Sequence, residues 1–459
     1  MKLLKGILKV FSGFLLIIIV FLAISIQPVQ EQDFNDTDYF GKTTAAINTF
    51  QWNASNDTVT PLEVGWASGN IMPEGISPMA GYRYRGAFEE VHDSLYCRVF
   101  VLEKGEVKAA LIELDLLIFP PSVTQKLKTK LASTHWKFEE LYLSASHTHS
   151  GVGNWAAGLY GIFVSGGYDE GYVEKITNTI LTALGKAYQE KQESHFGYKE
   201  IAVPEYVRNR LTDEGTVNDQ LKLIKFVRED SSQAALVSYT AHPTTISSRY
   251  LAISNDYPYY LMREIIQHEP IDFCAFFAGA MGSHGPTGQK GKAGTWFQLP
   301  ETIGKGLAKK VVVTWDSIQL AAPKTFAVGK IPLYFDDLHI RVSKELRTRN
   351  WLFEAVAGEQ LMDISLLQIG NLTMLSTPFD FSGELALQLE EEMPLGRHLM
   401  INNFNGAYIG YITPDDYYHR IKRPETMEMN WLGPQNGSYV MEILSEILEK
   451  TSQGISQHP

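Results

Sequence analysis

The chain has 459 residues, of which 44% are hydrophobic and 20% charged, a composition typical of a globular protein that excludes a disordered one. Its 40 basic and 52 acidic residues give a net charge of -12, and the sequence shows no local basic patch, so nucleic acid is excluded as an expected partner. Cys97 and Cys274 each lie in an apolar run and are predicted to be buried thiols rather than a disulfide. A metal would therefore be bound by histidine, carboxylate or tyrosine.

The N-terminal segment, residues 1–26, combines positive charge with an apolar stretch. Lys2, Lys5 and Lys9 precede the uncharged run from Val10 to Ile26, a pattern typical of export from the cytoplasm. The run is long for the core of a cleaved signal peptide and slightly short for a spanning helix. Because no clear cleavage site follows, we favour a membrane anchor on the extracytoplasmic side over a cleaved signal, which would leave a periplasmic or secreted protein.

Residues 27–61 are rich in polar side chains and are predicted to be a spacer, followed by a catalytic domain over residues 62–459. In this domain apolar strand-like runs alternate with helical patterns, which predicts an α/β fold with mixed β-sheets flanked by helices in a single large domain. The expected elements are a strand, helix and strand over 109–118, 123–131 and 141–146, a helix over 172–189, strands over 221–227 and 234–239, a hairpin joining 366–369 to 372–375, and a closing helix over 439–448.

Two predicted strands end in histidines. His147 and His149 follow the strand 141–146 and, two residues apart on an extended segment, would point to the same side. His242 follows the strand 234–239 in the same way, and strand ends are where α/β folds bind ligands. Each histidine alone also fits a structural role, but together they favour one site. Asp256 is either the hydrogen-bond acceptor of a metal-bound ring or a simple turn or cap residue.

Ordered motifs across the body carry a resemblance to a known family. They are Met79-Ala-Gly-Tyr, Ser146-His-Thr-His-Ser-Gly, Asn209-Arg210, Thr240-Ala-His-Pro, Ser254-Asn-Asp, Phe277-Ala-Gly-Ala-Met-Gly, Pro378-Phe-Asp-Phe-Ser and Tyr408-Ile-Gly-Tyr-Ile-Thr-Pro-Asp-Asp-Tyr. With these motifs the chain resembles the neutral/alkaline, non-lysosomal ceramidase family. The resemblance implies a zinc enzyme that hydrolyses the amide of ceramide or a related N-acyl lipid into a fatty acid and a sphingoid base or amine.

The same resemblance implies residue roles. The family's zinc ligands would fall on His147, His242, Asp380 and Tyr411. His149, Arg210 and Tyr411 would stabilise the charge that develops on the amide oxygen, while bound zinc would lower the pKa of water to about 7. Without the resemblance, Tyr411 would be one more aromatic residue in a tyrosine-rich segment and Arg210 a solvated surface charge.

The chain departs from the family pattern in three places. The loop Gly279-Ala-Met-Gly-Ser-His-Gly-Pro lacks the acidic residue of many members, and its Ser283-His284 pair is not expected to form a nucleophile and base because adjacent residues rarely meet in that geometry. The acidic ligand is Asp380, with Glu384 as an alternative ligand on a helix beginning near Phe381, and Asp380 could instead cap that helix. Because only a closing helix and a short tail follow Gly433-Pro434, we expect no C-terminal immunoglobulin-like domain of the kind found in the family.

Two further functions stay open at this point. One is a catalytically inactive, membrane-anchored binding protein with a ceramidase-like fold, and the other is a metal-dependent hydrolase of a non-lipid amide. The sequence does not determine the acyl chain, the head group, the choice between hydrolysis and the reverse condensation, or the oligomeric state.

Overall fold

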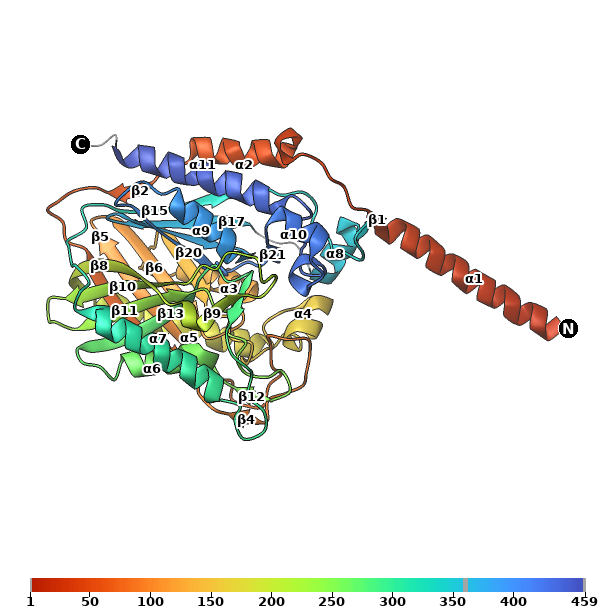
Figure 1. Ribbon diagram of the computed structural model, residues 1–459, viewed down its shortest axis with the longest axis horizontal. Helices are drawn as coiled ribbons and strands as arrows, with labels where there is room; N and C mark the ends of the chain where they lie inside the picture. Colours follow the sequence, from red (N-terminus) through yellow and green to blue (C-terminus); the bar gives the residue numbers. More distant parts are fainter. Residues whose placement is uncertain (1, 358–361, 457–459) are drawn as a thin grey trace.

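Two β-sheets pack against each other, and helices cover their outer sides in the computed structural model, which describes residues 2–357 and 362–456 (Figure 1). The larger sheet has eight strands in the spatial order β13 (Ile271–Ala278), β11 (Gln233–Tyr239), β10 (Gln220–Arg228), β8 (Gln192–Ala202), β3 (Glu63–Asn70), β5 (Tyr96–Lys104), β6 (Val107–Leu114) and β7 (Glu140–Ala145). The smaller sheet has five strands in the order β2 (Asn53–Ser55), β15 (Phe326–Pro332), β17 (Asp363–Ile369), β18 (Leu372–Thr377) and β20 (His398–Asn403). Both sheets mix parallel and antiparallel pairs.

The larger sheet is so strongly curled that its edge strands β7 and β13 contact each other. Tyr142 of β7 and Phe277 of β13 stack with ring centroids 6.2 Å apart, inside a buried cluster that also contains Phe100, Leu367 and Met374. Because successive side chains of a strand alternate between faces, one face of each sheet contributes to this core. Each fully buried side chain of this size stabilises the fold by roughly 1.5–3 kcal/mol. The predicted α/β class with mixed sheets in a single domain is confirmed.

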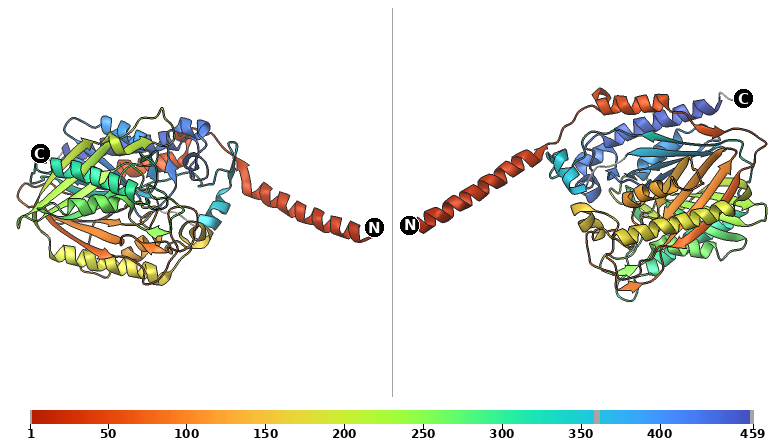
Figure 2. Two further views of the ribbon diagram at one scale, coloured as in Figure 1. Left: turned by 60° about the horizontal axis from the view of Figure 1, so that its bottom comes forward. Right: turned by 180° about the vertical axis from the view of Figure 1, so that it is seen from behind.

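Helices cover the outer faces because their apolar residues recur every three or four positions. Helices α3 (Pro121–Leu131), α5 (Glu170–Gln189), α6 (Asp256–Ile265) and α7 (Gln298–Trp315) cover the larger sheet (Figure 2). In α5 the buried residues Val173, Ile176, Ile180 and Leu184 form the stripe that faces β3 and β5. Helices α2 (Asp38–Thr49), α9 (Gly383–Glu391) and α11 (Asn436–Ser456) cover the smaller sheet (Figure 1).

Most elements predicted from the sequence are confirmed. The strand, helix and strand correspond to β6, α3 and β7, and the hairpin around Gly370 joins β17 to β18. The closing helix α11 is longer than expected, since it runs from Asn436 to Ser456. Residues 27–61 were predicted to be a polar spacer, but part of this segment belongs to the folded body, because α2 packs against α11 and β2 pairs with β15. Both cysteines are buried and unpaired, as predicted.

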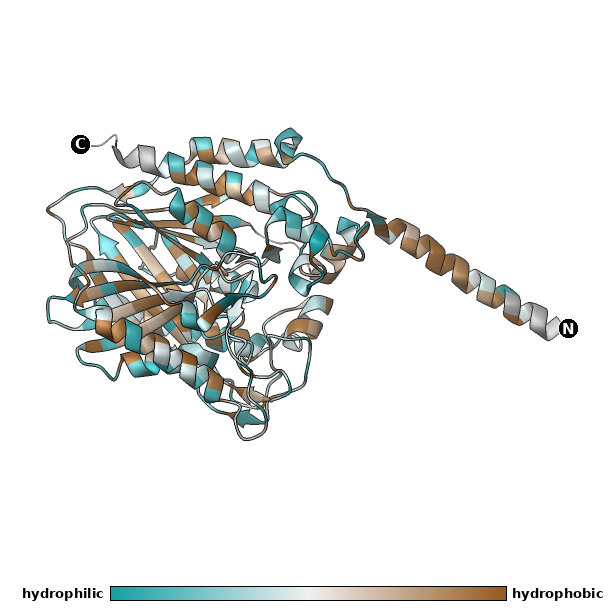
Figure 3. Cartoon of the chain, in the orientation of Figure 1, coloured by the Kyte–Doolittle hydropathy of each residue, from teal (hydrophilic) through white to brown (hydrophobic). Residues whose placement is uncertain are grey.

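Helix α1 (Lys2–Ser25) extends away from the body, next to α8 (Asn350–Ala357) (Figure 1). It is held at its base by Trp351, which donates from Nε1 to the carbonyl of Ile24 at 2.8 Å. Large apolar side chains between Val10 and Ile24 are exposed. The hydropathy colouring marks much of this helix as hydrophobic (Figure 3). Within the part of the chain that the structure describes, no helix combines the length and the hydropathy needed to cross a membrane. Membrane association through α1 stays a prediction.

Candidate metal centre and active site

The residues predicted to form the site lie in loops and in one short strand pair, at the edge where strands of both sheets end. His147 follows β7 and His242 follows β11, and each of these strands is parallel to a neighbour. Asp380 and Tyr411 lie opposite each other in the short parallel pair of β19 (Asp380–Phe381) and β21 (Tyr411–Ile412). Ligands of α/β proteins bind at the carboxyl ends of parallel strands. The fold therefore gathers side chains from distant segments at the expected edge.

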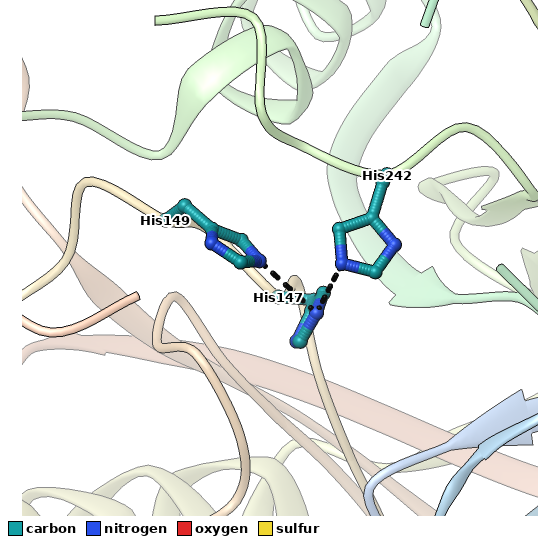
Figure 4. A group of neighbouring side chains, drawn as sticks. All are labelled: His147, His149 and His242. Carbon is teal, nitrogen blue, oxygen red and sulfur yellow. Dashed lines mark hydrogen bonds between the residues drawn. The ribbon is translucent and has the colours of Figure 1, made fainter. Parts of the chain in front are cut away.

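Three imidazole rings meet at this edge (Figure 4). The Nε2 atom of His147 lies 2.8 Å from Nε2 of His242 and 3.3 Å from Nε2 of His149. His147 and His242 are buried, whereas His149 is partly exposed. Their ligand atoms all lie within 4.8 Å of one another, so the described part of the chain contains a histidine group compact enough to bind a metal ion.

Backbone carbonyls fix the hydrogen of both buried rings. Nδ1 of His147 donates to the carbonyl of Leu117, and Nδ1 of His242 donates to the carbonyl of Met281 at 3.2 Å. Because a carbonyl only accepts, each neutral ring carries its hydrogen on Nδ1 and a lone pair on Nε2. Burial lowers the pKa of His147 to about 3 and that of His242 well below its usual value. At neutral pH two lone pairs therefore face each other without a proton between them.

A buried carboxylate completes the cluster. Oδ2 of Asp380 lies 3.5 Å from Nε2 of His147 and has no hydrogen-bond partner among the described residues, while Oδ1 accepts from Asn403 at 3.4 Å. Burial raises the pKa of Asp380 to about 7, although the positive charge of Arg210 acts in the opposite direction. An unpartnered buried carboxylate oxygen destabilises a protein, and an adjacent cation would remove that penalty.

Glu384 has a different environment from Asp380. Its Oε1 accepts a hydrogen bond from the Tyr417 hydroxyl at 2.8 Å. The expected helix that would place both acids on one face is wrong, because Asp380 belongs to β19 and α9 begins at Gly383. Asp380 does not cap this helix either, since the cap is Ser382.

The rings of His147 and His149 were expected to point to the same side because of strand alternation. In the structure they converge through a turn instead. The strand β7 ends before them, and His147 has a left-handed backbone with φ of 65°. Phe404 stacks on the His147 ring with centroids 4.2 Å apart and an interplanar angle of 13°. Gly81, with φ of 111°, backs onto His149, where a Cβ atom would lie 2.3 Å from the Cα atom of His149.

Arg210 is hydrogen-bonded to Tyr411 and is mostly buried, not a solvated surface charge. Its Nη2 donates to the Tyr411 hydroxyl at 3.3 Å and to the carbonyl of Gly282 at 3.1 Å, and its Nη1 pairs with Glu425 at 3.1 Å. Burial and the nearby charge of Asp380 raise the pKa of Tyr411 well above its usual value. The Tyr411 hydroxyl therefore keeps its proton at neutral pH and can act as a hydrogen-bond donor.

Asp256 does not orient a histidine, so that alternative is wrong. Its carboxylate accepts from the backbone of Thr245, Ile246 and Tyr257 at 3.0, 3.2 and 2.7 Å, and from the Thr245 hydroxyl at 2.6 Å. The backbone carbonyls of Leu117 and Met281, not Asp256, accept the ring hydrogens of His147 and His242. Asp256 is the first residue of α6, which agrees with the other interpretation, that of a residue at a turn or helix start.

Ser283 and His284 do meet, contrary to expectation, with Ser283 Oγ 2.8 Å from His284 Nδ1. However, His284 Nε2 accepts from the backbone N–H of Asn218 at 2.7 Å, so the ring hydrogen lies on Nδ1 and donates to Ser283. This tautomer cannot accept the serine proton. The loop instead supports its neighbours, since Gly282 donates to the carbonyl of Phe381 at 2.7 Å and Arg210 donates to that of Ser283 at 2.9 Å.

Residues 76–262 match the family described as neutral/alkaline non-lysosomal ceramidase, N-terminal. The resemblance to the ceramidase family is confirmed. The segment that matches the ceramidase family includes His147, His149, Arg210 and His242, while Asp380 and Tyr411 lie beyond it.

Two solved structures are similar to the chain in fold. The neutral ceramidase from Pseudomonas aeruginosa superimposes with a TM-score of 0.72 at 17% identity, over 86% of this chain and 75% of that one. A ceramidase complexed with C2 has a TM-score of 0.71 at 16% identity, over 86% of this chain and 76% of that one. The ceramidase fold therefore accounts for most of the chain.

Sequence reasoning missed several residues of the site. Asn403 and Phe404 lie at the end of β20, and Glu425 holds Arg210 from a separate segment. Tyr82 covers the partly exposed side of the site, with its ring centroid 5.0 Å from that of His149. Asn403 could have been found, because an apolar run that ends in asparagines repeats the pattern of the histidine strands, but nothing in the local sequence marks Glu425.

Proposed function

We propose that this protein is a zinc-dependent amidohydrolase that cleaves the amide bond of ceramide or a related N-acyl lipid into a fatty acid and a sphingoid base or amine. The resemblance to the ceramidase family supports the amide chemistry and the lipid class. The observation that carries the metal dependence is the pair of Nε2 lone pairs on His147 and His242, which face each other at 2.8 Å beside an unpartnered oxygen of Asp380.

The donor set fits zinc in chemistry and spacing. Ligand atoms 2.0–2.1 Å from a tetrahedral zinc ion lie ~3.3 Å apart. From Nε2 of His147 the separations to two other assigned ligands are 2.8 Å for His242 and 3.5 Å for Asp380, which bracket that value. Nitrogen and oxygen donors without a thiolate suit a hydrolytic zinc site. We assign His147, His242 and Asp380 as ligands, with the hydroxyl oxygen of Tyr411 completing the set.

His149 differs from the two buried ligands. Its Nδ1 has no hydrogen-bond partner among the described residues, whereas the rings of His147 and His242 are each anchored to a carbonyl. Metal-bound imidazoles are normally oriented by such a second hydrogen bond. A ring without this anchor, on the exposed side of the centre, suits contact with the substrate, so we assign His149 to catalysis.

The remaining chemistry concerns the charge on the amide oxygen. Zinc, when bound, polarises the scissile carbonyl and lowers the pKa of water to about 7. The Tyr411 hydroxyl, polarised by Arg210 at 3.3 Å, donates to the oxygen as negative charge develops. His149 donates to the same oxygen from its partly exposed position, and Glu425 keeps the Arg210 guanidinium in place. Tyr411 and Arg210 are held by hydrogen bonds and an ion pair before substrate binds, which makes such stabilisation effective.

A catalytically inactive binding protein is the weaker alternative because the altered loop leaves the centre complete. The loop around Ser283 still holds Arg210 and β19 through backbone hydrogen bonds. A non-lipid amide as substrate is tested by the substrate series below. We also propose that the chain acts outside the cytoplasm in association with a membrane, supported by the lysines and the apolar run of α1 and by the exposure of its large apolar side chains.

The test uses the purified full chain. Zinc is measured by elemental analysis, and hydrolysis of a fluorogenic N-acyl sphingoid is followed before chelation, after chelation and after zinc is returned. We expect about one zinc per chain, loss of turnover on chelation and its recovery with zinc. As a matched control, Glu384→Gln changes a carboxylate outside the centre and should behave like the unaltered protein. Hydrolysis that persists after complete removal of metal would refute the proposal.

A further inference from the structure

Two cations lie beside His149, on the partly exposed side of the centre. Both contact the ring of Tyr82, with Arg85 Cζ 5.0 Å and Lys290 Nζ 5.3 Å from its centroid. The Tyr82 ring is itself 5.0 Å from the His149 ring. Arg85 Nη2 donates to the carbonyl of His149 at 2.7 Å, and Lys290 Nζ donates to the Tyr82 hydroxyl at 3.0 Å. One tyrosine thus holds two positive charges next to a residue assigned to catalysis.

Neither cation is neutralised by a carboxylate in the part of the chain that the structure describes. Arg85 bonds only to backbone carbonyls and to the face of Tyr82, and its buried Nε has no hydrogen-bond partner among the described residues. Lys290 contacts the hydroxyl and the ring of Tyr82. In a chain with a net charge of -12, two adjacent cations without an acidic partner are unexpected for a purely structural arrangement.

We refer to Arg85, Lys290 and the Tyr82 ring that both contact as the rim of the site. Three acidic groups on neighbouring segments are already engaged. Glu428 pairs with the exposed Arg83 at 3.3 Å, and Glu425 pairs with Arg210 at 3.1 Å. Asp256 is buried and accepts four hydrogen bonds, two from Thr245 and one each from Ile246 and Tyr257. The rim therefore has positive charge available for a ligand.

We infer that the site takes N-acyl substrates that carry an anionic group a few bonds from the amide nitrogen. The anion binds between Arg85 and Lys290, and the amide lies at the centre formed by His147 and His242. Each terminal nitrogen of Arg85 donates one hydrogen to a backbone carbonyl and keeps a second for the oxygens of a carboxylate or sulfonate, and Lys290 adds a mobile point charge. This inference rests on the proposed function and narrows its substrate class to acidic N-acyl lipids.

A matched substrate series tests the inference. N-dodecanoylglycine, N-dodecanoyltaurine and N-dodecanoylethanolamine share one acyl chain and one amide but carry a carboxylate, a sulfonate and a neutral hydroxyl. With the zinc-loaded full chain we expect kcat/KM to be at least about tenfold higher for an anionic amide than for the neutral one, because charge-assisted hydrogen bonds are roughly twice as strong as neutral ones. The order of glycine and taurine conjugates identifies which anion is preferred.

Two variants test whether Arg85 and Lys290 cause the preference for anionic over neutral amides. Lys290→Gln and Arg85→Gln should each lower the ratio of anionic to neutral kcat/KM about fivefold to tenfold. Lys292→Gln is the matched control, since Lys292 is an exposed lysine on the same loop and should leave the ratio unchanged. Arg85→Lys keeps the charge without the planar donors, so it should retain more of the preference than Arg85→Gln.

Failure of the inference is distinguishable from failure of the proposed function. Equal kcat/KM for all three amides, or an unchanged ratio in Lys290→Gln, would overturn the anionic substrate class and leave the amidohydrolase intact. No hydrolysis of these amides or of ceramide by the zinc-loaded chain would overturn the proposed function. Calorimetric binding of the three amides to the full chain carrying Asp380→Asn then decides the inference without turnover: tighter binding of the anions supports it, and equal binding overturns it.

Discussion

The Nε2 atoms of His147 and His242 lie 2.8 Å apart although 95 positions separate the two residues in the chain. The strands that precede them, β7 and β11, lie close to opposite edges of the larger sheet. The two histidines meet because the curled sheet brings β7 against β13, which is the parallel neighbour of β11. The approach of the two histidines thus depends on the closure of the sheet. A change that moves β7 away from β13 should therefore weaken metal binding even if both strands keep their own structure.

His147→Ala and His242→Ala should each abolish hydrolysis and lower bound zinc. Each substitution removes one of the facing lone pairs and leaves too few donors for a divalent ion. Elemental analysis and a hydrolysis assay on the same samples check this. His195→Ala, an exposed histidine on β8, is the matched control and should keep both zinc and activity. Full zinc in His147→Ala would show that the metal assignment is wrong.

Asp380→Asn should lose zinc, whereas Glu384→Gln should keep it. Oδ2 of Asp380 is buried beside His147 without another partner, while Glu384 already accepts a hydrogen bond from Tyr417. Zinc content and hydrolysis are measured in parallel for both variants. The opposite result, with zinc retained by Asp380→Asn and lost by Glu384→Gln, would make Glu384 the ligand.

His149→Ala and Arg210→Ala should reduce kcat by ~10²-fold or more while zinc stays bound, because a lost oxyanion donor affects the transition state rather than the metal. The two residues contact the centre without being assigned as ligands, and Arg210 acts through the Tyr411 hydroxyl. Steady-state kinetics together with zinc analysis separate the two effects. Loss of zinc in His149→Ala would place that ring among the ligands instead.

Ser283→Ala should keep zinc and most of the hydrolytic activity but should be less stable. The Ser283 hydroxyl receives hydrogen bonds from His284 and Ser382, and leaving these buried donors unsatisfied costs about 1–3 kcal/mol. Thermal unfolding and a zinc-dependent assay check both parts, and a serine-directed organophosphate should leave the unaltered protein active. Covalent labelling of Ser283 with loss of activity would support a serine hydrolase.

The full chain should sediment with membranes and be released by detergent but not by high salt. Exposed apolar side chains surround α1, and burying them in lipid is favourable. Deleting residues 1–26 should move the protein to the soluble fraction with its zinc site intact, because the site residues lie far along the chain from this segment. A soluble native protein whose N-terminus lies beyond Ile26 would contradict the anchor.

The sequence by itself predicted most of the elements and indicated the candidate side chains of the site. Periodicities of two and of three to four residues mark the strands and helices correctly, because alternation and helical stripes reflect which face is buried. Histidines directly after two apolar strands indicated the site, and the motifs around Asp380 and Tyr411 indicated the remaining candidates. These features are local, so the order of residues is sufficient to predict them.

Only the tertiary structure decided how these side chains are oriented and which charges they face. The carbonyls of Leu117 and Met281 set the tautomers of His147 and His242, and the N–H of Asn218 sets that of His284. The sequence showed no basic patch, yet Arg85 and Lys290 meet on one tyrosine ring from segments about 200 residues apart. Backbone hydrogen bonds and charges brought together by chain folding leave no periodic signal, because they depend on which distant segments the curled sheet makes neighbours.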